Sequence, residues 1–265
     1  MLGSNQRPPP CRGGALPAEL TARGDAENSA LGVTCRRVLG LLYDVHGNLP
    51  ALEAVLADAE ALGVGRWLLG GDYALFGAWP AETVARLKEL DATWIRGNGE
   101  RWTASPEEAP EAVRGAVERN RDLLGEALVD ELAALPESWR DGDTLFCHGS
   151  PVSDVRSFLP EPAEDEGELL SDVPPDLSRL VFGHTHLAFR RQAGEGLELV
   201  NPGSAGMPFD GDPRAAYALV EGDGSVVHRR VAYDHSSSAA AVRDRLGDAG
   251  EAPARRIERA SADAS

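Results

Sequence analysis

The chain has 265 residues, of which 42% are hydrophobic, so it is long enough to bury the core of one large domain or two small ones. Its formal net charge of -17 argues against a protein that binds nucleic acid over a broad basic surface, because that binding needs clustered lysines and arginines. No apolar run approaches the ~20 residues that span a bilayer, so no membrane association is expected. An anionic substrate would need local positive charge, which a bound metal can supply.

The first 36 residues are rich in proline, glycine and alanine and lack the hydrophobic segment of a signal peptide. We expect a disordered extension over residues 1–36, or a start codon placed too early. The three cysteines, Cys11, Cys35 and Cys147, form no close pair and no zinc-binding spacing. This pattern favours a reduced, cytoplasmic setting, with Cys147 as a small buried residue of a strand.

An apolar run over residues 38–43 predicts a buried strand, and the segment Asp44-Val45-His46-Gly47-Asn48 follows it directly. Open α/β sheets bind their ligands at the carboxyl ends of the strands. Asp44 and His46 are two residues apart, so in extended backbone their side chains point to the same side and can hold one ion together. A carboxylate oxygen with an imidazole nitrogen suits a divalent transition metal.

A helix is predicted between Asn48, its potential N-cap, and Gly63. Strands predicted over residues 66–69 and 93–95 end in Gly70-Gly71-Asp72 and Arg96-Gly97-Asn98-Gly99-Glu100, with a helix over about residues 80–90 between them. Strands that alternate with helices at this spacing predict parallel crossover units. Three successive strands that end in such turns indicate ligands converging on one sheet edge.

Residues 107–135 are predicted to be helical scaffold, and a hairpin over residues 141–143 leads to a strand over residues 144–147 and then to His148. The acidic, proline-rich stretch 158–176 predicts a mobile flap. A strand over residues 179–182 leads into Gly183-His184-Thr185-His186, and antiparallel strands are expected up to about Tyr233. We therefore expect a folded domain over residues 37–235 and a flexible, charged tail over residues 236–265.

Five segments in this order resemble the motif blocks of the calcineurin-like metallophosphoesterase superfamily: Asp44-x-His46-Gly47-Asn48, Gly71-Asp72, Gly97-Asn98-x-Glu100, His148-Gly149 and Gly183-His184-Thr185-His186. The resemblance spans residues 37–233. It implies an α/β fold, a four-layer αββα sandwich of two mixed β-sheets flanked by helices. It also implies two divalent transition metal ions, with manganese as the first expectation and iron, zinc or nickel as alternatives.

The resemblance assigns a ligand to each position of the pattern. Asp44, His46 and His186 would hold one ion, Asn98, His148 and His184 the other, and Asp72 would bridge both. Two ions ~3.5–4 Å apart can clamp the attacking and departing oxygens of an in-line phosphoryl displacement, and a shared water becomes acidic enough to attack as hydroxide. The implied substrate is a small phosphorylated molecule, a phosphodiester or a nucleotide, and no Ser or Cys nucleophile is required.

Two further residues are candidates for binding the substrate. The guanidinium fork of Arg96 fits two phosphoryl oxygens, and the alternative is a surface arginine paired with Glu100. Asn48 is a candidate for hydrogen bonding to the hydroxide or the substrate, and the alternative is helix capping.

Gly99 departs from the family pattern, because many relatives carry there a histidine thought to protonate the leaving group. Leu75 and Phe76 also replace the Asp-Arg pair of the protein-phosphatase branch. Both departures favour the small prokaryotic phosphodiesterase-like branch. We therefore expect a phosphodiesterase, with two alternatives: a phosphomonoesterase acting on phosphoproteins or nucleotides, or a metal- or nucleotide-binding scaffold with little catalysis.

Overall fold

The computed structural model describes residues 38–194 and 196–263. The chain divides into the units Met1–Arg36 and Arg37–Ser265, and the described residues belong to the second. The extension predicted over residues 1–36 lies outside the described residues. Among the described residues, none of the helices has the length and apolar character needed to cross a membrane.

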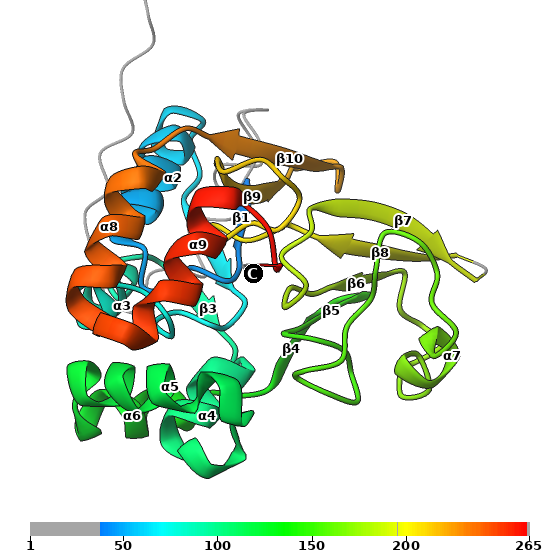
Figure 1. Cartoon of the computed structure of the whole chain (residues 1–265). Coiled ribbons are helices and arrows are strands. Elements are labelled where there is room, and N and C mark those ends of the chain that lie inside the picture. Colours follow the sequence, from blue (N-terminus) through cyan, green and yellow to red (C-terminus); the bar gives the residue numbers. More distant parts are fainter. Residues whose placement is uncertain (1–37, 195, 264–265) are drawn as a thin grey trace, which may run out of the picture. The chain divides into compact units, whose positions relative to one another are not determined.

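The first of two five-stranded sheets (Figure 1) contains the strands that precede the predicted ligands Asp44, Asp72 and Asn98. Its strand order is β10-β9-β1-β2-β3, and β1, β2 and β3 run parallel, whereas β9 and β10 are antiparallel to their neighbours. The strands are β1 (Leu39–Leu42), β2 (Arg66–Leu69), β3 (Ala92–Trp94), β9 (Ala215–Val220) and β10 (Val226–Val231). The parallel core of this sheet agrees with the predicted crossover units.

The second sheet has the order β4-β5-β6-β8-β7, with a parallel centre of β5, β6 and β8 and antiparallel edges. Its strands are β4 (Ser138–Asp141), β5 (Thr144–Cys147), β6 (Arg179–Val181), β7 (Phe189–Ala193) and β8 (Leu197–Asn201). Both sheets are therefore mixed, as predicted.

Eight α-helices accompany the sheets in the described residues: α2 (Leu49–Ala61), α3 (Pro80–Leu87), α4 (Asn98–Ala104), α5 (Glu111–Leu124), α6 (Glu126–Ala133), α7 (Glu166–Leu169), α8 (His235–Leu246) and α9 (Glu251–Arg259). Short 3-10 helices occur at η2 (Pro106–Glu108) and η3 (Gly247–Gly250). The stretch predicted as a mobile flap contains α7, whose buried Leu169 packs with Phe158 against the second sheet. These side chains, together with Leu170 and Val173, hold in place a segment that is rich in acidic residues and prolines.

The two sheets share a core. Leu41 and Leu68 of the first sheet pack in one cluster with Phe146, Val181 and Val200 of the second. The other face of the first sheet is covered by α2 and α3, through side chains such as Val55 and Val84. This layering confirms the predicted αββα architecture, because alternate side chains of each strand must be buried on opposite faces.

The C-terminal segment differs from the flexible tail predicted over residues 236–265. It forms α8 and α9, which pack against each other (Figure 1, orange and red). Val242, Leu246 and Ile257 are buried in a cluster that includes Leu75 and Phe76 from the loop after β2. The sequence is mostly Ala, Ser, Arg and Asp, so its composition conceals a narrow apolar stripe that is sufficient for docking.

Candidate metal centre

The seven predicted ligands follow five different strands and come together where the parallel strands end. Asp44 and His46 follow β1, Asp72 follows β2, and Asn98 begins α4 after β3. His148 follows β5, and His184 and His186 follow β6 in the second sheet. Six of these side chains are buried, and that of His184 is half-buried. The fold thus brings the carboxyl ends of the parallel strands of both sheets to one place.

Backbone strain is concentrated at these ligands. Seven non-glycine residues in the described part of the chain have positive φ, and five of them are predicted ligands: Asp44, His46, Asp72, His184 and His186. A residue of this kind in the left-handed region costs on the order of 1–3 kcal/mol, and such residues cluster at functional sites. The prediction that extended backbone directs Asp44 and His46 to the same side was wrong, because both residues are left-handed and converge through a tight turn.

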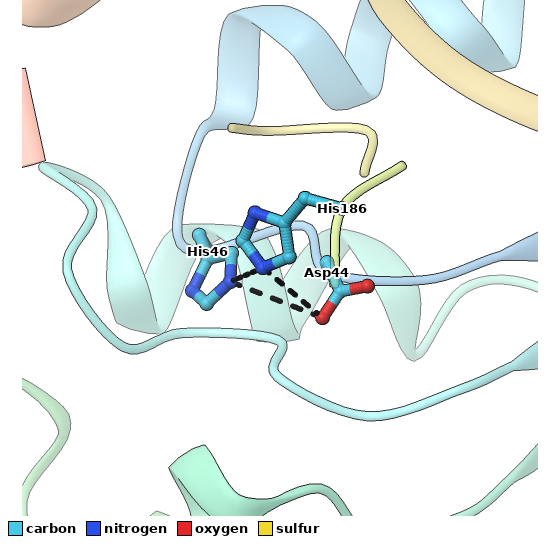
Figure 2. Close-up of side chains that lie close together, drawn as sticks. All are labelled: Asp44, His46 and His186. Atoms are coloured by element: carbon cyan, nitrogen blue, oxygen red, sulfur yellow. Dashed lines mark hydrogen bonds and ion pairs between the residues drawn. The ribbon is translucent and has the colours of Figure 1, made fainter. Parts of the chain in front are cut away.

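Three ligands form the first group, shown in Figure 2. The Nε2 atoms of His46 and His186 lie 3.0 Å apart. The Oδ1 atom of Asp44 lies 4.0 Å from Nε2 of His46 and 3.5 Å from Nε2 of His186. Ligand atoms of these three residues all lie within 4.8 Å of one another, so they can share one ion.

Backbone carbonyls determine which ring nitrogen of three histidines is available. Nδ1 of His46 lies 2.8 Å from the Leu75 oxygen, and Nδ1 of His148 lies 2.8 Å from the Gly70 oxygen. Nδ1 of His186 lies 2.5 Å from the carbonyl oxygen of Met207. Because a carbonyl only accepts hydrogen bonds, each Nδ1 carries a proton, and Nε2 is the nitrogen of each ring that faces the other predicted ligands.

The buried carboxylate of Asp44 fits a cation. Its Oδ2 accepts a hydrogen bond from the His184 backbone N–H at 3.1 Å, whereas its Oδ1 has no hydrogen-bond partner and is buried. Burial alone would raise the pKa of this carboxyl, but the neighbouring imidazoles, His186 first, hold the pKa well below its ordinary value. A buried anionic oxygen facing imidazole lone pairs is stable only when positive charge is present.

Burial also keeps two of the histidines neutral. It lowers the pKa of His46 to about 3 and that of His184 to about 4. An imidazole must be deprotonated to bind a metal. Both side chains are therefore in the ligand form at neutral pH.

Asp72 lies between the two groups of ligands. Its Oδ2 is 3.8 Å from Nε2 of His46, and its Oδ1 is 3.5 Å from Nε2 of His148. The terminal atom of the Asn98 amide that faces the histidines lies 3.1 Å from Nε2 of His148 and 2.8 Å from Nδ1 of His184. Ligand atoms of Asp44, Asp72 and His148 also lie within 4.8 Å of one another. The residues present fit a divalent metal centre, and Asp72 faces both halves of it.

Comparison with known proteins identifies the family. Residues 38–225 match the model of the calcineurin-like phosphoesterase superfamily domain. The chain belongs to the calcineurin-like phosphoesterase superfamily. It is therefore a metallophosphoesterase, a phosphoric ester hydrolase of a family that binds divalent metals.

Three relatives extend the comparison. A metallophosphoesterase from Sphaerobacter thermophilus has 27% sequence identity and a TM-score of 0.70, with 85% of this chain and 99% of that one covered. The hypothetical protein PH1004 from Pyrococcus horikoshii OT3 has 20% identity and a TM-score of 0.73, with 84% of this chain and 97% of that one covered, and shows the shared fold. The uncharacterized protein MJ0912 of Methanocaldococcus jannaschii is 27% identical in an alignment 222 residues long, which covers 75% of this chain and 89% of that protein.

Gly99, the departure from the family pattern, contacts Asp72 of this metallophosphoesterase directly. Its N–H donates a hydrogen bond of 2.6 Å to Oδ1 of Asp72. A Cβ atom at this position would lie 2.7 Å from the same oxygen, which is closer than real contacts allow. Gly99, which stands where many relatives carry the histidine, thus allows the backbone of α4 to approach the Asp72 carboxylate closely.

Glu100 has a positioning role that the sequence interpretation did not assign, since it named Glu100 only within a motif block and as a possible partner of Arg96. Its carboxylate is buried and accepts hydrogen bonds from the backbone N–H groups of Asp72 (2.9 Å), Tyr73 (2.8 Å) and Gly97 (2.8 Å). It therefore ties the loop after β2 to the loop after β3. An acid in the first turn of a helix, where backbone N–H groups are free, was the available signal.

Arg96 and Asn48 are engaged elsewhere. The guanidinium of Arg96 binds the Ala133 oxygen at 3.2 Å and the Glu137 carboxylate, so the predicted alternative of pairing with Glu100 is wrong. Its role in phosphate binding stays a prediction.

Asn48 caps α2, because its Oδ1 accepts from the Ala51 N–H at 3.4 Å, as the alternative reading predicted. The same oxygen accepts from Ser238 at 3.0 Å, and Nδ2 donates to the Gly206 oxygen at 2.8 Å and to the Tyr233 hydroxyl at 3.0 Å. These four bonds fill the hydrogen-bonding capacity of the amide and leave none for a substrate.

Proposed function

We propose that this metallophosphoesterase holds two divalent transition metal ions and cleaves a small phosphodiester or nucleotide by in-line attack of water on phosphorus. The position of Asp72 carries the proposal, because its two oxygens face His46 and His148, which belong to different ligand groups. When bound, the ions would acidify the attacking water and neutralise charge on the phosphoryl group. Manganese is the first expectation, and iron, zinc and nickel suit the same nitrogen and oxygen ligands.

The residues of the chain hold and orient this centre. Asp44, His46 and His186 would hold one ion, and Asn98, His148 and His184 would hold the other. The Nδ1 hydrogen bonds of His46, His148 and His186 to backbone carbonyls keep the rings from rotating. Preorganised ligands cost no reorganisation energy when charge develops in the transition state.

Gly99 supports the preference for activated esters. The family histidine that would protonate the leaving group is replaced by a backbone N–H bound to Asp72. Without that acid, cleavage depends on a leaving group that is stable as an anion. We therefore propose phosphodiesters with such a leaving group, aryl phosphodiesters among them, as the preferred class, with phosphomonoesters as the second candidate.

The test combines metal content with hydrolysis. Metal-free protein is titrated with manganese, zinc, nickel or magnesium singly, and bis(p-nitrophenyl) phosphate and p-nitrophenyl phosphate are assayed side by side. We expect activity to saturate near about two equivalents of a transition metal and to favour the diester.

Three outcomes would contradict the proposal in whole or in part. Two bound metals with neither ester cleaved would favour a metal- or nucleotide-binding scaffold. Absence of tight metal binding would overturn the assignment of the centre itself. Faster cleavage of the monoester would replace the diester preference with the second candidate.

A further inference from the structure

The metal centre opens into a cavity of about 240 Å³ whose opposite wall comes from the C-terminal helix α9. Five predicted ligands line this cavity: His46, Asp72, Asn98, His184 and His186. Its remaining wall is largely apolar and includes Trp102 and Phe209, and α9 contributes Arg256. A guanidinium therefore lines the same space as the metal ligands.

The charge of Arg256 is not compensated within the described residues. Its Nε atom is buried without a hydrogen-bond partner, and no carboxylate of the described chain forms an ion pair with it. Its guanidinium lies over the Phe209 ring, with 6.0 Å from Cζ to the ring centroid. The guanidinium is half-buried and has no carboxylate beside it, so an anion that binds there would gain a charge-assisted hydrogen bond in a partly desolvated setting.

Other arginines near the centre differ from Arg256 in this respect. A second cavity, of about 490 Å³, adjoins His148 and is lined by Arg96 and Arg101. Arg101 binds Asp154 with two hydrogen bonds, of 2.7 and 2.8 Å, and also binds the carboxylate of Glu108. Arg96 is bound to Glu137. Their charges are already compensated by carboxylates, which leaves Arg256 as the better anion-binding group.

Phe209 contacts both Arg256 and the predicted ligand His186. The Phe209 and His186 rings are stacked, with centroids 4.2 Å apart and planes 20° apart, and the Phe209 N–H donates to the His186 carbonyl at 3.3 Å. Together with the Arg256 contact to Phe209, this stack places the guanidinium carbon at most about 10 Å from the His186 ring centroid. A phosphate ester bound at the centre spans such a separation.

The helix that carries Arg256 is docked in place. Ile257 and Ala254 are buried beneath it, and the carbonyl of Ala260 accepts a hydrogen bond of 2.9 Å from the Gly211 N–H. Its partner α8 is anchored by Ser238, whose hydroxyl donates to Oδ1 of Asn48. These contacts connect α9 to the loop that carries Phe209 and to the turn after β1.

We propose that Arg256 binds the phosphoryl group of the substrate at the metal centre. The guanidinium fork can donate two parallel hydrogen bonds to phosphoryl oxygens, and the apolar walls strengthen them by excluding water. The inference rests on the proposed function. Arg256 lies outside residues 38–225, which match the family model, so the phosphate would be held by a segment beyond the shared ligand set.

The test measures inorganic phosphate binding to the metal-loaded protein, by calorimetry and as inhibition of diester hydrolysis. Arg256→Met removes the charge at similar length, and Arg256→Lys keeps the charge but loses the fork. Arg255→Met is the matched control, since Arg255 is the adjacent residue of α9 and pairs with Glu251. We expect Arg256→Met to raise the phosphate dissociation constant by about tenfold or more, Arg256→Lys to have a smaller effect and Arg255→Met none. Metal content should be unchanged in all three.

Phosphate binding needs no turnover, which separates this inference from the proposed function. Wild-type affinity in Arg256→Met and Arg256→Lys would overturn the role of Arg256, even if wild-type protein hydrolyses the diester. A wild-type protein that binds metal and phosphate but cleaves no ester would overturn the proposed function. A loss of phosphate affinity in Arg256→Met would in that case still support the role of Arg256.

Discussion

At the scale of single residues, the centre depends on groups that are not ligands. The rings of His46 and His148 are oriented by carbonyl oxygens of the loop after β2, and that of His186 by a carbonyl oxygen of the loop after β8. Asp72 is positioned by the N–H of Gly99 and, through its backbone, by Glu100. Groups that orient ligands in this way are expected to affect metal affinity nearly as much as the ligands do.

Glu100→Gln tests this dependence. Oε2 accepts from Asp72 and Gly97 and Oε1 accepts from Tyr73, so either orientation of a glutamine amide turns its NH₂ group against at least one N–H donor. We expect the free energy of unfolding to fall by about 1–3 kcal/mol and metal affinity to fall by about 10- to 100-fold. Urea unfolding and metal titration measure both. Glu137→Gln, at an exposed glutamate, serves as the control, and unchanged metal affinity in Glu100→Gln would contradict the positioning role.

The Asp72 carboxyl predicts a pH dependence of metal binding. Burial raises its pKa to about 7 in the metal-free protein, so the carboxyl holds its proton below that pH. A bound metal requires the carboxylate, and binding must therefore release the proton. We expect about one more proton released at pH 6 than at pH 8, and metal affinity that falls as the pH drops below 7.

Calorimetry in buffers of different ionisation enthalpy counts these protons. Asp58→Asn is the control, since Asp58 binds Arg229 and Tyr217 and is not among the ligands. The same proton release at both pH values would contradict the pKa assigned to Asp72.

At the scale of elements, the strand ends supply the predicted ligands, and the C-terminal helix α9 contributes Arg256 to the wall of the cavity. Parallel β1, β2 and β3 direct their carboxyl ends to one edge, which explains why successive turns carry metal-binding residues. Helices α8 and α9 then pack on Leu75 and Phe76, in the loop that follows Asp72. The tail predicted from composition is thus part of the site.

Ile257→Ala distinguishes a docked helix from a flexible tail. Ile257 is 1% exposed, so its truncation leaves a cavity, and we expect the free energy of unfolding to fall by about 2–5 kcal/mol. Phosphate binding should weaken as well, because α9 carries Arg256. Glu258→Ala, at an exposed residue of the same helix that pairs with Arg243, should cost at most about 1 kcal/mol. Equal stability of Ile257→Ala and wild type in urea would support the flexible tail.

At the scale of the whole molecule, the centre gathers buried carboxyl groups within a chain whose formal net charge is -17. Asp44 and Asp72 are 0% and 3% exposed, and Oδ1 of Asp44 lacks a hydrogen bond. Bringing such groups together without a cation opposes folding. Metal ions are therefore expected to contribute to stability as well as to catalysis.

Removal of metal should lower the melting temperature. A ligand that binds only the folded state at about 100 times its dissociation constant adds about 2.7 kcal/mol per site. Thermal unfolding with a chelator and with excess manganese measures the difference. Asp72→Asn should show a much smaller difference, because it removes the carboxylate that faces both ligand groups. Identical melting temperatures of the wild type with and without chelator would contradict a bound metal centre.

Local patterns were sufficient to predict the strands, the turns and the seven side chains that converge. A buried strand and the tight turn that follows it depend on neighbouring residues, so the segments from Asp44 to His186 could be recognised in chain order. The αββα fold followed from the resemblance that those segments carry. Cys147 also agrees with its prediction, because it is a buried free cysteine of β5.

The remaining features depend on which distant segments meet. The partners of Asn48 include Gly206, Tyr233 and Ser238, more than 150 residues away, and no local pattern specifies them. Arg256 reached the cavity because α9 docks through a few apolar side chains that average composition conceals.

The sequence by itself therefore determined the fold class and the family, because short motif segments that are recognisable in chain order carry both. Only the tertiary structure decided what holds each predicted ligand in place and which arginine lines the cavity without a carboxylate partner among the described residues. Those outcomes arise from packing between segments far apart in the chain, where charge compensation and burial are set by the whole fold.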